Sequence, residues 1–206
     1  SIRSTNQGTN DNSVGHKVYS NILTQSEKYD SVNPITFGTE GTSANNTSDV
    51  WLTSNVVYNP TAATDGRGLV DTQRPVESMV VFNNIFAEHR CMTRYDYLLE
   101  NEGSPLYQDY NTYYQGTSHS GVLFSYDLDG IYPKTEYSNI TDQRTNTNYD
   151  DNSIVLDPAF TDAGSGVFTL QGASPAVGGG VSGTDMGVYL TGVEIIGPVG
   201  LQVEGS

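Results

Sequence analysis

Apolar residues along this chain recur in short runs and not at the spacing of an amphipathic helix. No segment of about 12 residues places apolar side chains at positions i, i+3, i+4 and i+7. β-Branched and aromatic residues instead form short stretches, which clusters of Gly, Asn, Asp, Ser and Pro separate. This pattern predicts an all-β protein.

Four of the apolar runs share one polar position. The segments 18–25, 52–59, 81–88 and 108–115 each contain an Asn followed by a short β-prone run. These residues are Asn21, Asn55, Asn84 and Asn111, which lie 34, 29 and 27 residues apart. A second strand-like run follows each of them, at 34–38, 67–71, 93–99 and 121–128. The chain therefore contains an imperfect repeat with loops of uneven length between the runs.

A solenoid of parallel strands explains why an Asn recurs beside apolar residues. Each coil stacks on the previous coil, so equivalent residues lie one strand spacing, about 4.8 Å, apart. An Asn at a tight bend tolerates the left-handed backbone conformation, and its amide can bond the Asn of the next coil. We therefore expect an Asn ladder along one corner. A β-sandwich with long loops is the competing architecture, but the chain has no Asn-Gly pair to mark a tight hairpin.

Composition narrows the possible partners. The chain has 206 residues with 24 acidic and 9 basic side chains, so its net charge is -15. That charge repels phosphate backbones and anionic lipid, which argues against nucleic acid and membrane insertion. Carboxylate and carbonyl oxygens suit calcium, which is the cofactor to expect if there is one. The single cysteine, Cys91, is predicted to be a small core residue.

The C-terminal part of the chain carries an ordered series of short motifs. They are DYN at 109–111, NSI at 152–154, DPAF at 157–160, GVFTL at 166–170, SPA at 174–176 and DMGVY at 185–189. In this order they resemble the closing segment of right-handed parallel β-helix proteins of the pectate-lyase-like superfamily. Val177-Gly178 departs from that pattern, where an Ile-Asp pair is common, and puts one capping hydrogen bond in doubt.

The resemblance implies both an architecture and a function. It implies a right-handed parallel β-helix over residues 1–156, read as the C-terminal part of a longer solenoid, and a capping segment over 157–206. Phe160, Phe168 and Leu170 are expected to cover the last coil. It also implies an extracellular or cell-surface protein that acts on a polysaccharide, as a lyase or a glycosidase for an acidic polymer.

No motif of a particular lyase family matches, so the candidate residues come from local chemistry. His89, Arg90 and Arg94 are the catalytic candidates, because a basic group near a uronate stabilises the charge formed when a proton leaves. Tyr95 and Tyr97 could stack on sugar rings. The alternative is that the arginines pair with nearby carboxylates on a solvated turn.

Asp127 and Asp129 are the metal candidates. They lie two residues apart, so both carboxylates could point to one side of a strand and hold calcium. The same pair could act in a glycosidase, and the plainer alternative is an acidic turn. A non-catalytic surface or filament protein, which would associate with itself through the solenoid ends or the apolar tail, is the alternative function.

Overall fold

The structure is a computed structural model of the chain. It describes residues 2–4, 13–24, 35–37, 47–59, 68–72, 78–95, 106–117, 119–126 and 135–188.

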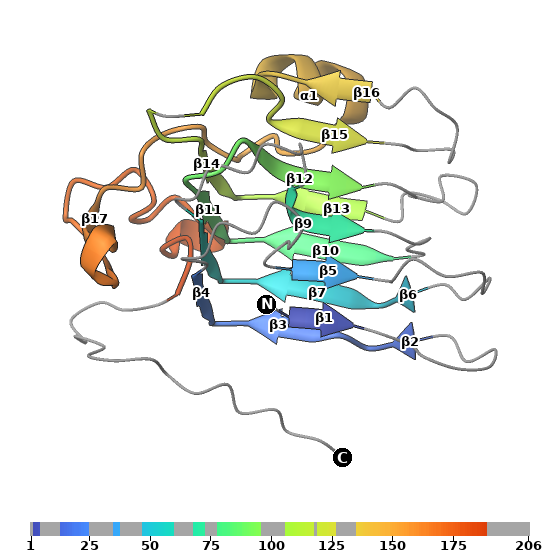
Figure 1. Cartoon of the computed structure of the whole chain (residues 1–206), viewed down its shortest axis with the longest axis horizontal. Coiled ribbons are helices and arrows are strands. Elements are labelled where there is room, and N and C mark those ends of the chain that lie inside the picture. The colour runs from blue at the N-terminus through green and yellow to red at the C-terminus, as the bar shows by residue number, and fades with distance from the viewer. Residues whose placement is uncertain are drawn as a thin grey trace.

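Most described strands belong to three sheets. In Figure 1 sheets 1 and 2 lie one behind the other, and sheet 3 lies across their left side. Sheet 1 contains β1 (Ile2–Ser4), β5 (Ile35–Phe37), β9 (Gly68–Thr72), β12 (Cys91–Tyr95), β15 (Phe124–Tyr126) and β16 (Thr135–Tyr137). Sheet 2 contains β3 (Lys17–Tyr19), β7 (Val50–Thr53), β10 (Met79–Phe82) and β13 (Leu106–Asp109). Sheet 3 contains β4 (Ile22–Thr24), β8 (Val56–Tyr58), β11 (Ile85–Ala87) and β14 (Thr112–Tyr114).

The chain visits these sheets in a repeating order. From β3 onward it passes through sheet 2, sheet 3 and sheet 1 in turn, and within each sheet every new strand pairs in parallel with the strand of the previous pass. Only β16 is antiparallel to its sheet 1 neighbour, β15. The fold is therefore all-β with stacked parallel strands, and it is compatible with a parallel β-helix.

Two smaller pairs of strands flank the main sheets. The parallel strands β2 (Ser13–Val14) and β6 (Thr47–Ser48) pair with each other, and so do the antiparallel strands β17 (Phe160–Asp162) and β18 (Val167–Leu170). The helical elements are α1 (Ile140–Thr147) and the short 3-10 turns η2 (Ala163–Ser165) and η3 (Val181–Gly183).

The second strand-like runs of the repeat all lie in sheet 1. β5, β9 and β15 fall in or directly beside the predicted runs, and β12 starts two residues earlier than its run, at Cys91. Residues 96–99 of that run lie outside the described part. The repeat that the sequence predicts is confirmed where the structure describes it.

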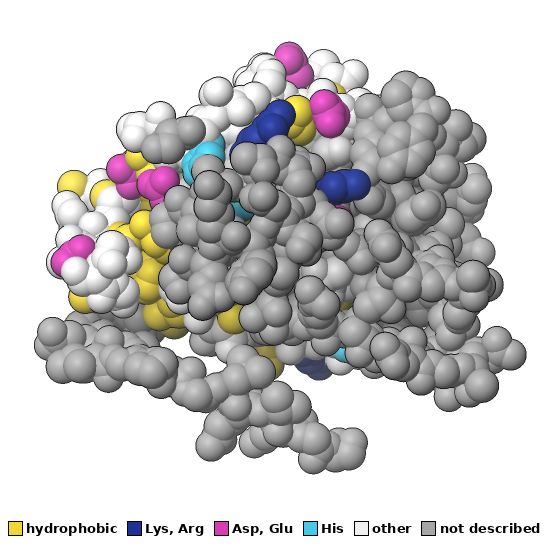
Figure 2. Space-filling model, in the orientation of Figure 1, with side chains coloured by type: hydrophobic (Ala, Val, Ile, Leu, Met, Phe, Trp, Pro, Cys, Tyr) yellow, Lys and Arg dark blue, Asp and Glu magenta, His cyan; other side chains and the backbone are white. Residues whose placement is uncertain are grey.

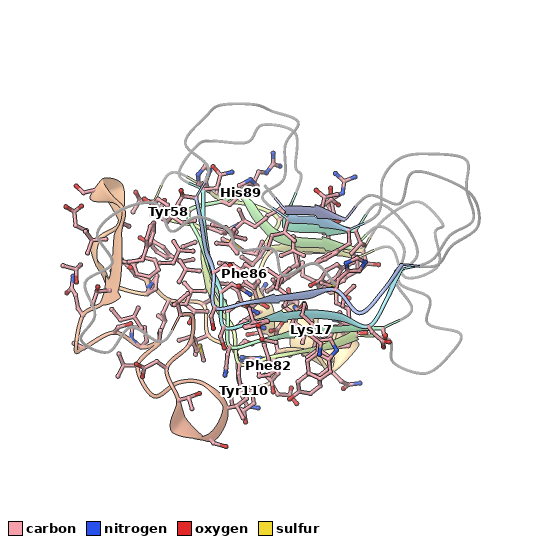
Figure 3. The ribbon with its side chains drawn as sticks, turned by 90° about the horizontal axis from the view of Figure 1, so that it is seen from below. Lys17, Tyr58, Phe82, Phe86, His89 and Tyr110 are labelled. Carbon is pink, nitrogen blue, oxygen red and sulfur yellow. The ribbon has the colours of Figure 1, made fainter. Side chains whose placement is uncertain are left out.

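Alternate residues of the three sheets point inward and form one core. Phe86 is fully buried, and its ring stacks on that of Tyr113 one strand away, with 5.6 Å between centroids. The Tyr113 ring in turn meets the edge of Phe124 from sheet 1 at 4.9 Å. Figure 3 shows Phe86 lying between the sheets. Burying a ring of this size stabilises the fold by about 1.5–3 kcal/mol.

The predicted Asn ladder is present at the corner between sheet 2 and sheet 3. Asn55 N and Nδ2 each donate to Asn84 Oδ1 at 3.0 Å, and Asn84 repeats both bonds to Asn111 Oδ1 at the same distances. Asn21 does the same to Asn55, at 3.0 and 3.2 Å. All but Asn21 are fully buried. The ladder therefore satisfies polar groups that would otherwise be costly at a buried corner.

The backbone at this corner differs from the prediction in one respect. The left-handed conformation belongs to the residue before each ladder Asn: Ser20, Ser54, Asn83 and Tyr110, with φ between 54° and 57°. The ladder Asn itself was expected to adopt it. Tyr110 shows that a bulky side chain is tolerated there, because the hydrogen bonds of the next residue hold the bend.

The one α-helix among the described residues, α1, lies beside β15 and β16 at one end of the stack (Figure 1). The sequence pattern did not predict it, because only Gln143 among its residues is buried and it has no apolar face. The sequence feature that marks this helix is its pair of capping residues. Asn139 Oδ1 accepts a hydrogen bond from Asp142 N at 2.9 Å, and Asn148 ends the helix with φ 57°.

The segment after residue 156 covers a side of the stack, and its expected place over the last coil is wrong. Phe168 and Met186 pack against Val56 and Ile85, which face outward from sheet 3. Gly187 N also donates to Asn83 O at 2.5 Å. Figure 1 accordingly shows β17 beside sheet 3 and away from α1. Residues 189–206 lie outside the described part.

Candidate functional site

Titratable side chains gather at the corner where β11 ends and β12 begins. Glu88 makes the bend with φ 60°, and its N donates to Tyr114 O on the next coil at 2.7 Å. We call Glu88, Arg90, Tyr114 and Asp157 the corner site. The loop after β14 and the chain at Asp157 approach the same corner, so residues from three separate stretches meet there.

The Glu88 carboxylate lies directly against the backbone of Gly116. The φ of 74° favours glycine at position 116, and a Cβ added there would lie 2.1 Å from Glu88 Oε2 and displace that carboxylate. Burial, and secondly the charge of Asp157, raise the pKa of Glu88. Glu88 therefore keeps its proton to higher pH than an ordinary glutamate, as a general acid must.

Two tyrosines border the same corner. Burial raises the pKa of Tyr58, and the nearby Glu88 charge adds to that rise. Burial likewise raises the pKa of Tyr114, which shares a hydrogen bond with Asp157 and lies close enough to Glu88 to feel its charge. Both hydroxyls therefore remain protonated. The Tyr58 hydroxyl can donate to an oxygen-rich ligand, whereas the Tyr114 hydroxyl donates to Asp157.

His89 lies behind this surface. It is only 2% exposed, and its Nδ1 lies 3.2 Å from N and 2.9 Å from O of Cys91. Its ring lies 6.4 Å from the ring of His119, whose pKa is lowered by burial. In this structure His89 can orient the bend but does not reach a ligand, so its predicted role changes from catalysis to positioning. Figure 3 shows His89 at this corner.

The two arginine candidates lie on either side of Cys91. Arg90 is partly exposed at the corner, where Gln115 Nε2 donates to its carbonyl oxygen. Arg94 lies on β12 in register with buried Asp71 on β9. That neighbour is one strand spacing away, which fits the alternative in which Arg94 pairs with a carboxylate. Arg90 therefore has the better position for a ligand.

Cys91 is a core residue, as the sequence predicts. It is 1% exposed, and burial is the main cause that raises its pKa to about 12. Arg94 and Arg90 oppose that rise, whereas Asp71 and Glu136 add to it. The thiol is therefore uncharged at neutral pH and does not serve as a nucleophile.

Tyr95 requires a correction. It is fully buried in the core, where its OH donates to Gln108 Oε1 at 2.7 Å. A sugar ring cannot stack on it without opening the core, because side chains alternate along β12 and position 95 points inward. Tyr97, Asp127 and Asp129 lie outside the described residues, so their predicted roles stay predictions.

Within the described ranges no three His, Cys, Asp or Glu side chains come together in a way that could hold a metal ion. Likewise, none of the helices described is long and apolar enough to cross a membrane.

Most of the corner site is not predictable from the sequence. Glu88 adjoins the predicted basic residues, and its place one residue after a strand was the available signal. Tyr114 and Asp157 had no such signal, because only the stacking of β14 on β11 and the return of the C-terminal segment bring them to Glu88. Figure 2 shows the side of the molecule with described acidic, basic and histidine side chains close together.

Comparison with protein-family models, with curated proteins and with solved structures gives no significant match. The resemblance to parallel β-helix proteins therefore rests on the motifs and on the stacked parallel sheets.

Proposed function

We propose that this protein is a right-handed parallel β-helix of the pectate-lyase-like kind that acts outside the cell on an acidic polysaccharide. One observation carries the proposal: a glutamic acid with a raised pKa lies close to a second carboxylate, at a bend that also carries a partly exposed arginine. These are Arg90, Glu88 and Asp157. Together they supply the charge and the proton donor that cleavage of a uronate polymer needs.

Each group has a role in that reaction. The Arg90 guanidinium binds the uronate carboxylate and stabilises the negative charge that develops beside it. Asp157 takes the proton from the carbon next to the carboxylate, and the freed electron pair forms the carbon–carbon double bond. The glycosidic carbon–oxygen bond breaks, and the leaving oxygen takes its proton from Glu88.

Hydrolysis by the same pair is the related possibility. Asp157 then activates a water molecule while Glu88 protonates the glycosidic oxygen. Product chemistry separates the two reactions, because only elimination gives an unsaturated sugar that absorbs ultraviolet light. Both reactions release reducing ends. A reducing-end assay therefore detects either reaction, and ultraviolet absorbance shows whether it is elimination.

The test is a panel of soluble glycans, with polygalacturonate and alginate as the acidic polymers and hydroxyethyl cellulose as the neutral one. We expect turnover of an acidic polymer, and a loss of roughly 100-fold or more on Glu88→Gln or Arg90→Ala. Arg94→Ala belongs in the same series, because Arg94 is also a candidate. Asp151→Asn, an exposed carboxylate without a role, should keep the full rate. Full activity in Glu88→Gln and Arg90→Ala would exclude the corner site.

A non-catalytic rod or adhesin is the second candidate. The observation that favours it is the uninterrupted Asn ladder, which stiffens the stack and needs no chemistry at its surface. That function predicts no turnover of any glycan on the panel, and ordered self-association detected by sedimentation or electron microscopy.

A further inference from the structure

The outer face of sheet 2 carries one aromatic ring on every strand. They are Tyr19 on β3, Trp51 on β7, Phe82 on β10 and Tyr107 on β13, and we call them the aromatic stripe. Tyr19 is 64% exposed, Trp51 44% and Tyr107 52%, while Phe82 is partly buried. Outward-facing rings on four successive strands, three of them exposed, are unusual, since large apolar side chains normally occur singly on a surface.

The register of the strands arranges these rings in a zigzag. Trp51 and Tyr107 belong to one row across the sheet, with Lys17 and Val80. Tyr19 and Phe82 belong to the adjacent row, and the Phe82 and Tyr107 rings meet edge to face at 6.5 Å. Three strand spacings separate the first and last strands, so the stripe spans about 14 Å.

The described strands of sheet 2 have one exposed charged side chain. It is Lys17, which lies in register with Trp51. Asp109 is also on these strands, but it is 9% exposed and its oxygens accept from Tyr110 N, Asn152 N and Asn152 Nδ2. In a chain of net charge -15, a face that presents a cation beside aromatic rings favours an anionic ligand with apolar surfaces.

We propose that the aromatic stripe binds an acidic polysaccharide that runs across the strands of sheet 2. The C–H faces of successive sugar rings stack on the aromatic rings, whose hydroxyl and indole groups remain free to bond sugar oxygens. Lys17 binds a uronate carboxylate at one end of the stripe. A second copy of the chain is the other occupant to test, and sedimentation velocity separates it from a polysaccharide.

The stripe is separate from the corner site. Figure 3 shows Lys17 and Phe82 on one side of the stack and His89 on the other. The inference takes its ligand class from the proposed function, but it assigns a second surface, which would hold the polymer while the corner site cleaves it.

Affinity electrophoresis of the full chain through gels that contain polygalacturonate, alginate or hydroxyethyl cellulose tests the stripe. We expect an acidic polymer to retard the protein. Trp51→Ala or Tyr107→Ala should weaken binding roughly tenfold each, as truncation of a buried aromatic contact does, and Trp51→Phe should restore most of it. Lys17→Ala should weaken binding to the acidic polymers, and Leu156→Ala, an equally exposed apolar side chain elsewhere, should change nothing.

Three outcomes would overturn the inference. They are no retardation by any acidic polymer, unchanged retardation of Trp51→Ala and Tyr107→Ala, and a dimer in sedimentation velocity that Trp51→Ala dissociates. Turnover is measured separately on short uronate oligosaccharides. Turnover without retardation would exclude polysaccharide binding at the stripe and would support the proposed function. Retardation without turnover would support binding at the stripe and would exclude the proposed catalytic function.

Discussion

Asn84 shows how much one side chain does at a buried corner. Its Oδ1 accepts two hydrogen bonds from Asn55, and its Nδ2 donates to Leu52 O at 2.8 Å as well as to Asn111. The amide is suited to this position because it donates and accepts at once, and a carboxylate or an alkyl group cannot do both.

Replacing Asn84 by Ala is expected to lower the free energy of unfolding by about 2–4 kcal/mol, because it leaves Asn55 N buried without its acceptor and removes the amide that donates to Leu52 O and Phe82 O. The measurement is urea unfolding followed by circular dichroism. Asn21→Ala is the matched control, since Asn21 is partly exposed and lies at the end of the ladder. Its cost should be about 1 kcal/mol. Equal costs for the two variants would contradict the ladder as a source of stability.

Asp150 ends the ladder with a buried carboxyl group. Its oxygens accept hydrogen bonds from Gln108 Nε2 at 2.5 Å, Gln143 Nε2 at 2.7 Å, Tyr113 OH at 2.9 Å and Ser153 Oγ at 2.6 Å. Burial raises the pKa of Asp150, while these four donors oppose the rise. Ser153 Oγ also accepts from Asn111 N, which joins this network to the last rung.

The raised pKa of Asp150 predicts a pH dependence of stability. Between the ordinary aspartate pKa, about 4, and the higher value in the folded state, the folded protein binds more protons than the unfolded chain. The contribution of Asp150 to stability is therefore present at low pH and is lost as pH rises through the folded-state pKa. Urea unfolding of the wild type and Asp150→Asn at several pH values measures the difference.

We expect the stability of the wild type relative to Asp150→Asn to fall as the pH rises from about 4 towards neutrality. Asp151→Asn is the control, because Asp151 is exposed and adjoins Asp150. A difference that stays flat across this range would show that the four donors cancel the effect of burial, and a difference that rises with pH would show that they outweigh it.

At the scale of elements, the C-terminal segment depends on its contacts with sheet 3. Phe168 is 6% exposed, and its ring meets those of Tyr58 and Phe160, each at 5.2 Å between centroids. The segment has little regular structure apart from β17 and β18, so these side-chain contacts hold it in place.

Phe168→Ala is expected to cost about 3 kcal/mol and to expose the segment to protease. Limited proteolysis with mass spectrometry, together with urea unfolding, measures both effects. Leu156→Ala is the control, because Leu156 is 54% exposed and should change stability by less than about 0.5 kcal/mol. If Phe168→Ala is cleaved no faster than Leu156→Ala, the segment is held by other contacts.

At the scale of the whole molecule, the charge of -15 makes stability sensitive to cations. Sodium chloride should raise the melting temperature slightly by screening repulsion. Calcium at equal ionic strength should raise it further if Asp127 and Asp129 bind the ion, since two carboxylates hold calcium more strongly than screening does. A chelator should reverse that increment.

The variant for this measurement is Asp127→Asn with Asp129→Asn. We expect it to keep the response to sodium chloride and to lose the extra response to calcium in a thermal melt. An identical calcium response in the variant and the wild type would exclude this pair as the site.

The fold was the more predictable part of this protein. The spacing of Asn21, Asn55, Asn84 and Asn111 matches the register of β4, β8, β11 and β14 residue for residue. A stacked repeat can be recognised from the sequence because equivalent residues contact the same neighbours in every coil. α1 could not be predicted in this way, since it has no apolar face toward the core and only its capping residues mark it.

The sequence by itself determined the all-β class, the repeat and the ladder, because each follows from local periodicity. Only the tertiary structure decided which side chains are accessible. It buried Tyr95 and His89, placed Asp157 beside Glu88, and left the aromatic stripe exposed on sheet 2. Those outcomes depend on which way each residue of a strand faces and on where distant segments return, and neither is fixed by the residues next to it in the chain.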